Sequence, residues 1–359
     1  MALRVLHVIE TLTPEAGSVA VCVEGLVAAL EARGVESACM ALDGGSVPAV
    51  GTGELNEYVG RADVVHLHGW GHPRARRIAR AAKRASRPWV VSPQGGLSGG
   101  KYNKKNWGGR IRNLLSERRL IRRAAVVTAS GEIEERDLSS RRVNPRVVRL
   151  GYGLEVEGYA LNGSPDHVQP GGNVCEVPGK WPHILLMLGP IHPIEGFVPL
   201  LKAFAEVGKE ADDWCVVLAG KETGEWRKIL EASVRRKGES DRVMIVPAPD
   251  VATQRAWLAR ASALASPSLH VRCPVSVMQG VAAGIPVLAS RNVVPPGSEG
   301  VVQVCGTSRD ALREGLRRLF ALSDAQRAEL RTRSRDFASA TFDWSVVADA
   351  YVQLYRGLL

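Results

Sequence analysis

The chain has 359 residues, of which 45% are hydrophobic and 23% charged, and this composition excludes a wholly disordered protein. At about 150 residues per domain its length predicts two domains, and its formal net charge is +10. The six cysteines lie far apart and form no CxxC pair, so we expect neither a disulfide framework nor a metal site.

Short apolar runs alternate with helical stretches through the first half of the chain. The run at 3–9 is typical of a buried strand rather than a signal peptide, and a helix is predicted at 18–33 from apolar residues at helical spacing. No run approaches the roughly 20 apolar residues of a membrane span, so we expect a cytoplasmic protein. Continuous apolar strands separated by helices indicate a parallel sheet covered on both faces. The further strands are predicted at 64–67, 89–92, 126–129 and 146–150, with helices at 74–86 and from Glu132 onward.

The positive charge is concentrated at 101–123, which contains nine basic side chains and one acid. Such a segment can face anionic lipid, nucleic acid or a phosphorylated ligand, or it can be a solvated helix face. It has few aromatic residues and matches no recognised nucleic-acid module, so no nucleic-acid partner is expected. The residues predicted to form an anionic-surface patch are Lys104, Lys105, Arg118, Arg119, Arg122 and Arg123.

Nine glycines and prolines between 158 and 182 mark a linker, after which the alternation restarts. Strands are predicted at 184–188, 215–219, 243–246, 263–266 and 285–289, with helices at 198–207, 225–237, 253–261 and 275–283. The stretch 344–359 is amphipathic and needs a surface to cover. We therefore predict an N-terminal domain at 1–157, a linker at 158–182, a C-terminal domain at 183–340 and a final helix at 341–359.

Two such domains bind ligands in a cleft, at the carboxyl ends of their strands. Those ends carry Gly17, His68, Gln94, Gly189, Lys221 and the loop around His270. There is no Walker A pattern, no GxGxxG after the first strand, no GxSxG elbow and no HExxH, which argues against the common nucleotide, hydrolase and zinc-protease sites.

Several segments, in order along the chain, resemble one family. HLHGW at 66–70 resembles its HxHGxW strand end, and SPQGGLS at 92–98 resembles its SPHGML segment. PEAGS at 14–18 stands at its Gly-Gly loop, and TASGE at 128–132 resembles its ATSE helix start. In the second half, LGPIHP at 188–193 resembles LGRIHPKKG, and LAG at 218–220 and AAGIPVLAS at 282–290 match closely. The chain thus resembles the retaining GT-B glycosyltransferases of the fourth family, which build bacterial surface polysaccharides.

The resemblance implies a GT-B fold, with two Rossmann-like domains facing a cleft and the last helix crossing back to the first domain. It implies transfer of a sugar from a nucleotide-sugar donor to a glycan or lipid-linked acceptor, without a metal or other cofactor. It also implies that the N-terminal domain receives the acceptor and touches the membrane, so the protein can be peripheral on the inner face of the membrane.

The sequence departs from the family where the donor chemistry is carried. An Arg and a Lys that neutralise the donor diphosphate are replaced by Pro190 and Glu195, and a pair of glutamates is replaced by Val271 and Gln279. The family's His is Gln94, and its Asn in a turn is Tyr152. Two hypotheses follow: a transferase with a degenerate, rebuilt donor site, or a non-catalytic relative that binds a glycan, a partner transferase or the membrane.

The remaining polar groups are the candidate site residues. For catalysis the candidates are His68, Gln94 and His270, and for the acceptor they are His68, Trp70 and Gln94. For the donor they are Gly17, Ser18, Gly189, Lys221, Arg272 and Gln279, where Gln279 can still bond a ribose hydroxyl as a neutral partner.

Overall fold

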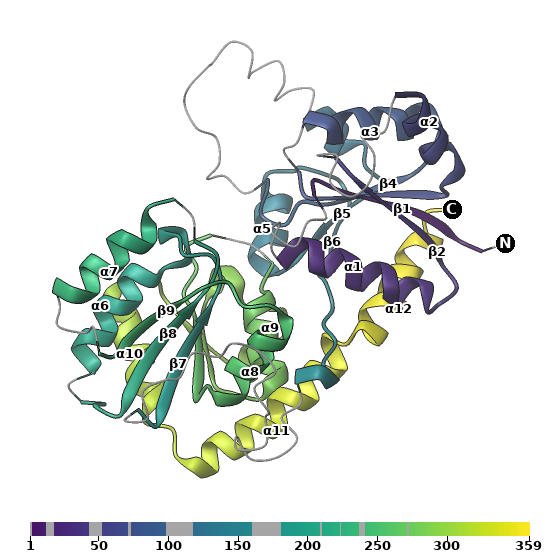
Figure 1. The fold of residues 1–359 in the computed structure, drawn as a ribbon. Coiled ribbons are helices and arrows are strands. Elements are labelled where there is room, and N and C mark those ends of the chain that lie inside the picture. Colours follow the sequence, from purple (N-terminus) through teal and green to yellow (C-terminus); the bar gives the residue numbers. More distant parts are fainter. Residues whose placement is uncertain are drawn as a thin grey trace. The chain divides into compact units, whose positions relative to one another are not determined.

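A computed structural model describes residues 2–11, 18–42, 52–70, 73–97, 118–159, 181–208, 210–222, 224–236, 241–270 and 273–359. The chain divides into two compact units (Figure 1). Unit 1 comprises residues 1–154, 271–273 and 341–359, and unit 2 comprises residues 155–270 and 274–340. Most of the predicted linker, residues 160–180, lies outside the described residues.

Unit 1 is built on a six-stranded sheet whose strand order is β2-β1-β3-β4-β5-β6, with every neighbouring pair parallel. The central strands are buried throughout, as continuous apolar runs predict. The strands are β1 (Arg4–Ile9), β2 (Glu36–Ala41), β3 (Val64–His68), β4 (Trp89–Ser92), β5 (Val126–Ala129) and β6 (Val147–Arg149).

Helices cover both faces of this sheet (Figure 1). On one face, α2 (Thr52–Arg61), α3 (Pro73–Arg84) and α5 (Glu132–Ser140) share an apolar core with β3. On the other face lie α1 (Ser18–Glu31) and α12 (Trp344–Arg356), which pack against each other. The buried face of α12 therefore has a surface to cover, and that surface belongs to unit 1.

Two glycines make room for the first residue of α12. A Cβ on Gly25 of α1 would lie 2.6 Å from the Trp344 ring, and one on Gly153 would lie 2.5 Å from it. The indole is thus held between two backbones that no larger residue would allow so close. The segment before α12 is tied by a hydrogen bond of 2.7 Å from Leu154 N to Phe342 O.

Unit 2 repeats the plan with the strand order β12-β11-β10-β7-β8-β9, again parallel throughout. One face of its sheet is covered by α6, α7 and α10 and the other by α8 and α9 (Figure 1). The strands are β7 (His183–Leu188), β8 (Trp214–Ala219), β9 (Val243–Val246), β10 (Ala263–Ser266), β11 (Val287–Ser290) and β12 (Val302–Cys305). The helices are α6 (Phe197–Val207), α7 (Trp226–Arg236), α8 (Val251–Arg260), α9 (Val275–Ala283), α10 (Arg309–Phe320) and α11 (Asp324–Thr341).

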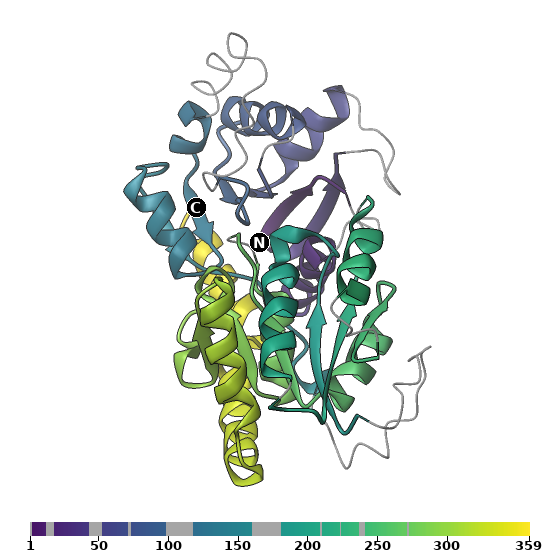
Figure 2. The same cartoon turned by 90° about the vertical axis from the view of Figure 1, so that its left-hand side faces the viewer.

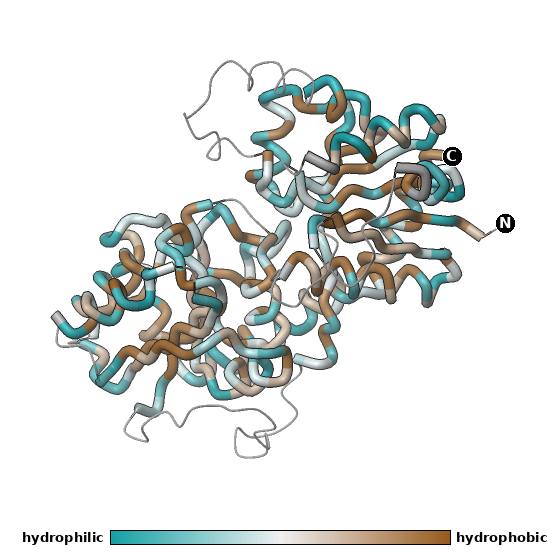
Figure 3. Tube along the Cα trace, turned by 45° about the horizontal axis from the view of Figure 1, so that its top comes forward, coloured by the Kyte–Doolittle hydropathy of each residue, from teal (hydrophilic) through white to brown (hydrophobic). Residues whose placement is uncertain are grey.

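In Figure 2, α11 is the long yellow-green helix that precedes α12 in the chain. Figure 3 shows apolar, brown segments along the strands of both units, which agrees with their buried side chains. The predicted α/β class with two parallel sheets is confirmed. Among the described residues, no helix combines the length and the apolar character that crossing a bilayer requires.

Candidate functional site

In unit 1, three parallel strands end side by side at one edge of the sheet. His68 is the last residue of β3, the loop 93–97 follows β4, and Ser130 follows β5. Ligands of doubly wound folds bind at this edge, where loops rather than strands present the side chains. The candidate residues His68, Trp70 and Gln94 all belong to this strand-end region.

The loop after β4 has an unusual backbone that a buried carboxylate holds in place. Gln94 has a φ of 50°, in the left-handed region that non-glycine residues rarely adopt. Glu134, 1% exposed, accepts hydrogen bonds from Gly95 N at 2.6 Å and from Ser130 N at 2.8 Å. Strained residues of this kind persist where the surroundings over-determine them, and they gather at functional sites.

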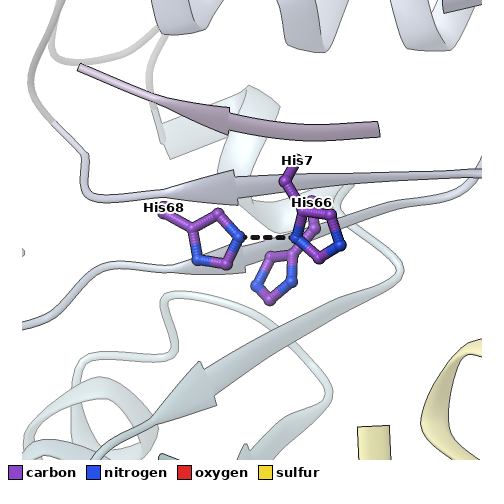
Figure 4. A group of neighbouring side chains, drawn as sticks. All are labelled: His7, His66 and His68. Carbon is purple, nitrogen blue, oxygen red and sulfur yellow. Dashed lines mark hydrogen bonds between the residues drawn. The ribbon is translucent and has the colours of Figure 1, made fainter. Parts of the chain in front are cut away.

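A chain of hydrogen bonds leads from this loop into the sheet. The Gln94 amide nitrogen donates to the Tyr152 hydroxyl, which lies 2.6 Å from His68 Nδ1. His68 Nε2 in turn lies 2.9 Å from Nδ1 of His7 on β1 (Figure 4). His7, His68 and Tyr152 are all buried. Gln94, at the outer end of this series of hydrogen bonds, is half-buried. We call these four residues the Gln94 chain.

His66 heads a second network on the same face of the sheet. Its Nδ1 lies 2.7 Å from the Tyr355 hydroxyl of α12, and its Nε2 lies 2.7 Å from Ser92 Oγ. Ser92 Oγ is 2.5 Å from Thr128 Oγ1 on β5. None of these bonds reaches Gln94, so His66 and the Gln94 chain are neighbours with separate partners.

Burial keeps the three histidines neutral. It lowers the pKa of His7 from 6.5 to about 3. Burial, followed by the charge that neighbouring histidines would carry, also lowers the pKa of His66 and His68. Each imidazole therefore carries one ring proton at neutral pH, and hydrogen-bond direction depends on which nitrogen holds it.

The same three histidines are the described residues that could hold a metal ion. One ligand nitrogen from each lies within 4.8 Å of the others. However, both nitrogens of His66 and both of His68 already face a hydroxyl or another imidazole at hydrogen-bond distance. We therefore interpret the cluster as hydrogen-bonded side chains rather than as a metal centre.

In unit 2, the loops after β7 and β8 run side by side. Ile191 N donates to Lys221 O at 2.9 Å, and Gly189 N donates to Ala219 O at 3.1 Å. A Cβ on Gly220 would lie 1.6 Å from Gly189 O, so only glycine permits this approach. The two strand ends thus form an edge of backbone that carries no side chain at Gly189 and Gly220, which we call the bare edge. The exposed Lys221 lies beside it.

The sequence around Glu195 forms a short 3₁₀ turn, Pro193–Glu195. His192 caps this turn, since its Nδ1 accepts a hydrogen bond from Ile194 N at 3.2 Å. The Glu195 residue is 4% exposed, so the acidic replacement is packed inside unit 2 rather than free in solvent. His270 lies in the adjoining loop, where Leu269 N donates to Ile194 O at 2.8 Å.

Gln279 has structural partners for its amide nitrogen. Nε2 donates to the Tyr159 hydroxyl at 3.0 Å and to Gln254 Oε1 at 2.9 Å. These bonds join α9 to the 3₁₀ turn Glu157–Tyr159 and to α8. Any ribose hydroxyl at Gln279 would have to bond the remaining carbonyl oxygen.

The other candidates are placed as follows. Ser18 is the first residue of α1, and Trp70 packs, partly buried, against the apolar core of unit 1. Gly17, Arg272, Lys104 and Lys105 lie outside the described residues. Arg118, Arg119, Arg122 and Arg123 are exposed. Three residues absent from the candidate list complete the strand-end site of unit 1, namely His7, Glu134 and Tyr152.

Two family models match the chain, one in each half. Residues 48–153 match a glycosyl transferase 4-like domain, and residues 182–321 match the glycosyl transferases group 1 domain. Each half of the chain thus matches a glycosyltransferase domain model. Among curated proteins, the chain is 24% identical to GDP-mannose:cellobiosyl-diphosphopolyprenol alpha-mannosyltransferase of Xanthomonas oryzae pv. oryzae, over 83% of the chain and 75% of that protein.

Solved structures share the whole fold of the chain. Sucrose-phosphate synthase from Thermosynechococcus elongatus has a TM-score of 0.73 at 18% identity, and 99% of each chain is covered. Anabaena Alr3699/HepE in complex with UDP has a TM-score of 0.73 at 16% identity, covering 99% of this chain and 100% of that one. At such identities the likeness shows the fold alone, and it confirms the predicted GT-B architecture.

Proposed function

We propose that the protein is a glycosyltransferase of the retaining, fourth-family type, which moves a sugar from a nucleotide-sugar donor to a lipid-linked glycan acceptor. The observation that carries this proposal is the Gln94 chain, a preorganised polar group at the strand ends of unit 1. Holding a ligand group in place before reaction is what a sugar site needs. The name of the Xanthomonas relative supports GDP-mannose and a cellobiosyl-diphosphopolyprenol as the first substrates to try.

Within this proposal Gln94 is the residue that bonds the sugar. Its amide nitrogen is engaged by Tyr152, while its carbonyl oxygen has no partner among the described residues. His68 is 4% exposed and both of its ring nitrogens are engaged, so it acts through Tyr152 rather than on the ligand. Trp70, which follows His68 after β3 and is partly buried, offers a packing surface for a sugar.

The donor site is proposed at the bare edge formed by Gly189 and Gly220 in unit 2. The diphosphate would meet Lys221 and, from the adjoining loop, His270. Pro190 and Glu195 supply no positive charge there, and a carboxylate disfavours a phosphate nearby. The buried Glu195 is also the observation that favours the second hypothesis, a non-catalytic relative that binds a glycan, a partner transferase or a membrane.

A binding panel separates the two hypotheses. The protein would be titrated by calorimetry with nucleotide sugars and with the matching nucleoside diphosphates. A transferase with a rebuilt donor site should bind at least one nucleotide sugar, and the Lys221→Ala variant should weaken that binding. If no member of the panel binds, the non-catalytic hypothesis holds.

The charges of the donor loop give a specific prediction. Two unit charges about 4 Å apart interact by about 4 kcal/mol at an effective dielectric of 20. We therefore expect weak or no binding of plain nucleoside diphosphates by the wild type, and tighter binding by the double variant Pro190→Arg, Glu195→Lys. Micromolar binding of uridine or guanosine diphosphate by the wild type, measured by calorimetry, would contradict this expectation.

We also propose that unit 1 attaches to anionic lipid, where a lipid-linked acceptor would be found. The exposed cations Arg118, Arg119, Arg122 and Arg123 flank Leu120 and Ile121, which pack into the same apolar core as α3. The helix α3 has six cations and no acid in twelve residues, so it adds charge on that face of the sheet. Each cation near an anionic surface contributes about 1 kcal/mol, so several together give reversible attachment.

Liposomes test this attachment. We expect the protein to sediment with anionic vesicles at low salt, to ignore neutral vesicles, and to be released as salt rises. Changing Arg118, Arg119, Arg122 and Arg123 to Ser should reduce the bound fraction at least tenfold, since about 1 kcal/mol is lost with each cation. The matched control replaces four cations of unit 2, Arg309, Arg313, Arg317 and Arg318, with Ser. Equal binding by the wild type and the unit 1 variant would leave the solvated-face interpretation.

A further inference from the structure

The Gln94 chain has a direction, which follows from the protons available along it. The Gln94 amide nitrogen donates to the Tyr152 oxygen, so the Tyr152 proton is free to go to His68 Nδ1. His68 Nδ1 then accepts, which places the proton of this neutral imidazole on Nε2. That N–H donates to His7 Nδ1, 2.9 Å away.

The series of donated hydrogen bonds ends at His7, whose other ring nitrogen has no partner among the described residues. Since His7 Nδ1 accepts, its own proton sits on Nε2, and this buried nitrogen has no hydrogen-bond partner among the described residues. His7 is 0% exposed. Unsatisfied buried polar atoms are rare and call for an explanation, because each costs stability.

We propose that His7, which lies away from any ligand, is a positioning residue that supports the hydrogen-bond polarity of the sugar-binding loop. By accepting from His68 Nε2–H it holds His68 and Tyr152 in one orientation. This orientation in turn holds the Gln94 amide with its nitrogen toward Tyr152 and its carbonyl oxygen left for a ligand. The loop therefore offers an acceptor to a hydroxyl donor of the sugar. Nε2 of His7 has no partner in either polarity, so what His7 contributes to the Gln94 chain is the hydrogen bond at Nδ1.

The opposite polarity is chemically available, so the choice matters. If His68 carried its proton on Nδ1, it would donate to the Tyr152 oxygen, and Tyr152 would donate to Gln94. The Gln94 amide would then turn over and present its nitrogen to the ligand. The inference rests on the proposed function in one respect, namely that the ligand of Gln94 is a sugar.

Histidine ¹⁵N NMR tests the polarity without any assay of activity. In the wild type at pH 7.5 we expect the Nε2–H tautomer at both His7 and His68. In Gln94→Glu the carboxylate can only accept, so the whole chain should reverse and both histidines should become Nδ1–H tautomers. His66, whose partners are Ser92 and Tyr355, should keep its tautomer and serves as the internal control. Unchanged tautomers at His7 and His68 in Gln94→Glu would overturn the proposal.

Kinetics test the consequence for the ligand, with GDP-mannose as donor and a cellobiosyl diphospholipid as acceptor. Removing the acceptor atom in His7→Leu should raise the acceptor KM about tenfold and change kcat less than about twofold, as expected for one misdirected hydrogen bond. His7→Asn, which restores an acceptor near the position of Nδ1, should recover most of the loss. His66→Leu, equally buried on the same face, should leave the acceptor KM unchanged.

A double-mutant cycle separates positioning from general damage. If His7 acts only through Gln94, then His7→Leu should have no further effect on acceptor KM in a Gln94→Ala background. An equal KM increase in both backgrounds would mean that His7 supports the fold only, and would overturn the proposal. If the wild type transfers no sugar, the proposed function fails, and the NMR comparison alone decides the polarity of the chain.

Discussion

Unit 1 should lose stability steeply as the pH falls from about 6 toward 4.5. The folded state keeps His7, His66 and His68 neutral, because burial lowers their pKa, in the case of His7 to about 3. The unfolded chain binds a proton on each below about pH 6.5, so unfolding takes up protons in this range. Each histidine then contributes a slope of about 1.4 kcal/mol per pH unit, and the three together about 4. Well above pH 6.5 both states are neutral, and the stability should not depend on these groups.

The titratable groups packed against the histidines stay uncharged inside this window. The side chains packed against the histidines include Tyr152, Tyr351 and Tyr355, whose pKa burial raises, so they stay uncharged. Hydrogen bonding by Arg4 lowers the pKa of Asp63 below 3.8, and hydrogen bonding by Thr253 does the same for Asp250, so both act at lower pH.

Urea unfolding at a series of pH values measures the slope, with ¹⁵N histidine signals reporting on unit 1. The wild type should take up close to three protons on unfolding near pH 5. The variants His7→Asn and His66→Asn should each take up one fewer, whatever their absolute stability. A stability that stays level between pH 6.5 and 4.5 would show that these histidines are protonated in the folded state.

The substitution Gly220→Ala should abolish donor binding. The added Cβ would lie 1.6 Å from Gly189 O, whereas ordinary contact begins at 3.4 Å, so that carbonyl would have to retreat by about 1.8 Å. Because the atom in the way is backbone, β7 and β8 must separate at the ends that form the proposed donor edge. We expect the affinity for the nucleotide sugar to fall at least about 100-fold, since misplacements of about 1 Å cost this much at preorganised sites. Unit 2 should also lose about 1–3 kcal/mol of stability.

Gly224→Ala is the matched control. Gly224 follows the same strand and has a φ of +62°, but no atom lies within 4 Å of its Cβ position. The control therefore carries a conformational cost of about 1–2 kcal/mol without a steric clash at the strand ends. Calorimetric titration of both variants decides the matter. Donor affinity that falls equally in both would refute the role given to the Gly189–Gly220 contact.

The sequence predicts those elements of the fold whose side chains are completely buried. Strands such as β8 are apolar on both faces, so they stand out as continuous runs. Two edge strands, β2 and β12, are not predicted. The first four residues of β2 are exposed or half-buried, and the two middle residues of β12 are half-buried, so neither strand is buried throughout. The helices α2, α10 and α11 are missed as well, since their sequences are largely polar.

The site was accessible only in part. The resemblance to a family points to Gln94 and His68, and the two-residue spacing of His66 and His68 places both on one face of a strand. His7 is remote in sequence, and only the register that pairs it with His66 brings it to the cluster. Tyr152 stands out in the sequence as a departure from the family, but its place between Gln94 and His68 depends on how the loops after the strands fold.

Glu134 illustrates the same limit. It lies four residues after Ser130 and accepts hydrogen bonds from the backbone N–H and the hydroxyl of that residue. That spacing alone would suggest a local contact at the start of a helix. Its bond to Gly95 joins helix α5 to a loop 39 residues earlier in the chain, and that bond makes it a support of the candidate site. The internal pairing of Gln279 with Tyr159 and Gln254 is equally non-local.

Direct observation of sugar transfer is the most decisive test of this account. Purified protein would be incubated with GDP-mannose and a cellobiosyl diphospholipid, then with other nucleotide sugars in turn, and the lipid product would be analysed by mass spectrometry. We predict an acceptor lengthened by one hexose in the wild type, and a strongly reduced yield in Gln94→Ala under the same conditions. A wild type that extends no acceptor with any nucleotide sugar, and binds none of them, would contradict the proposed transferase.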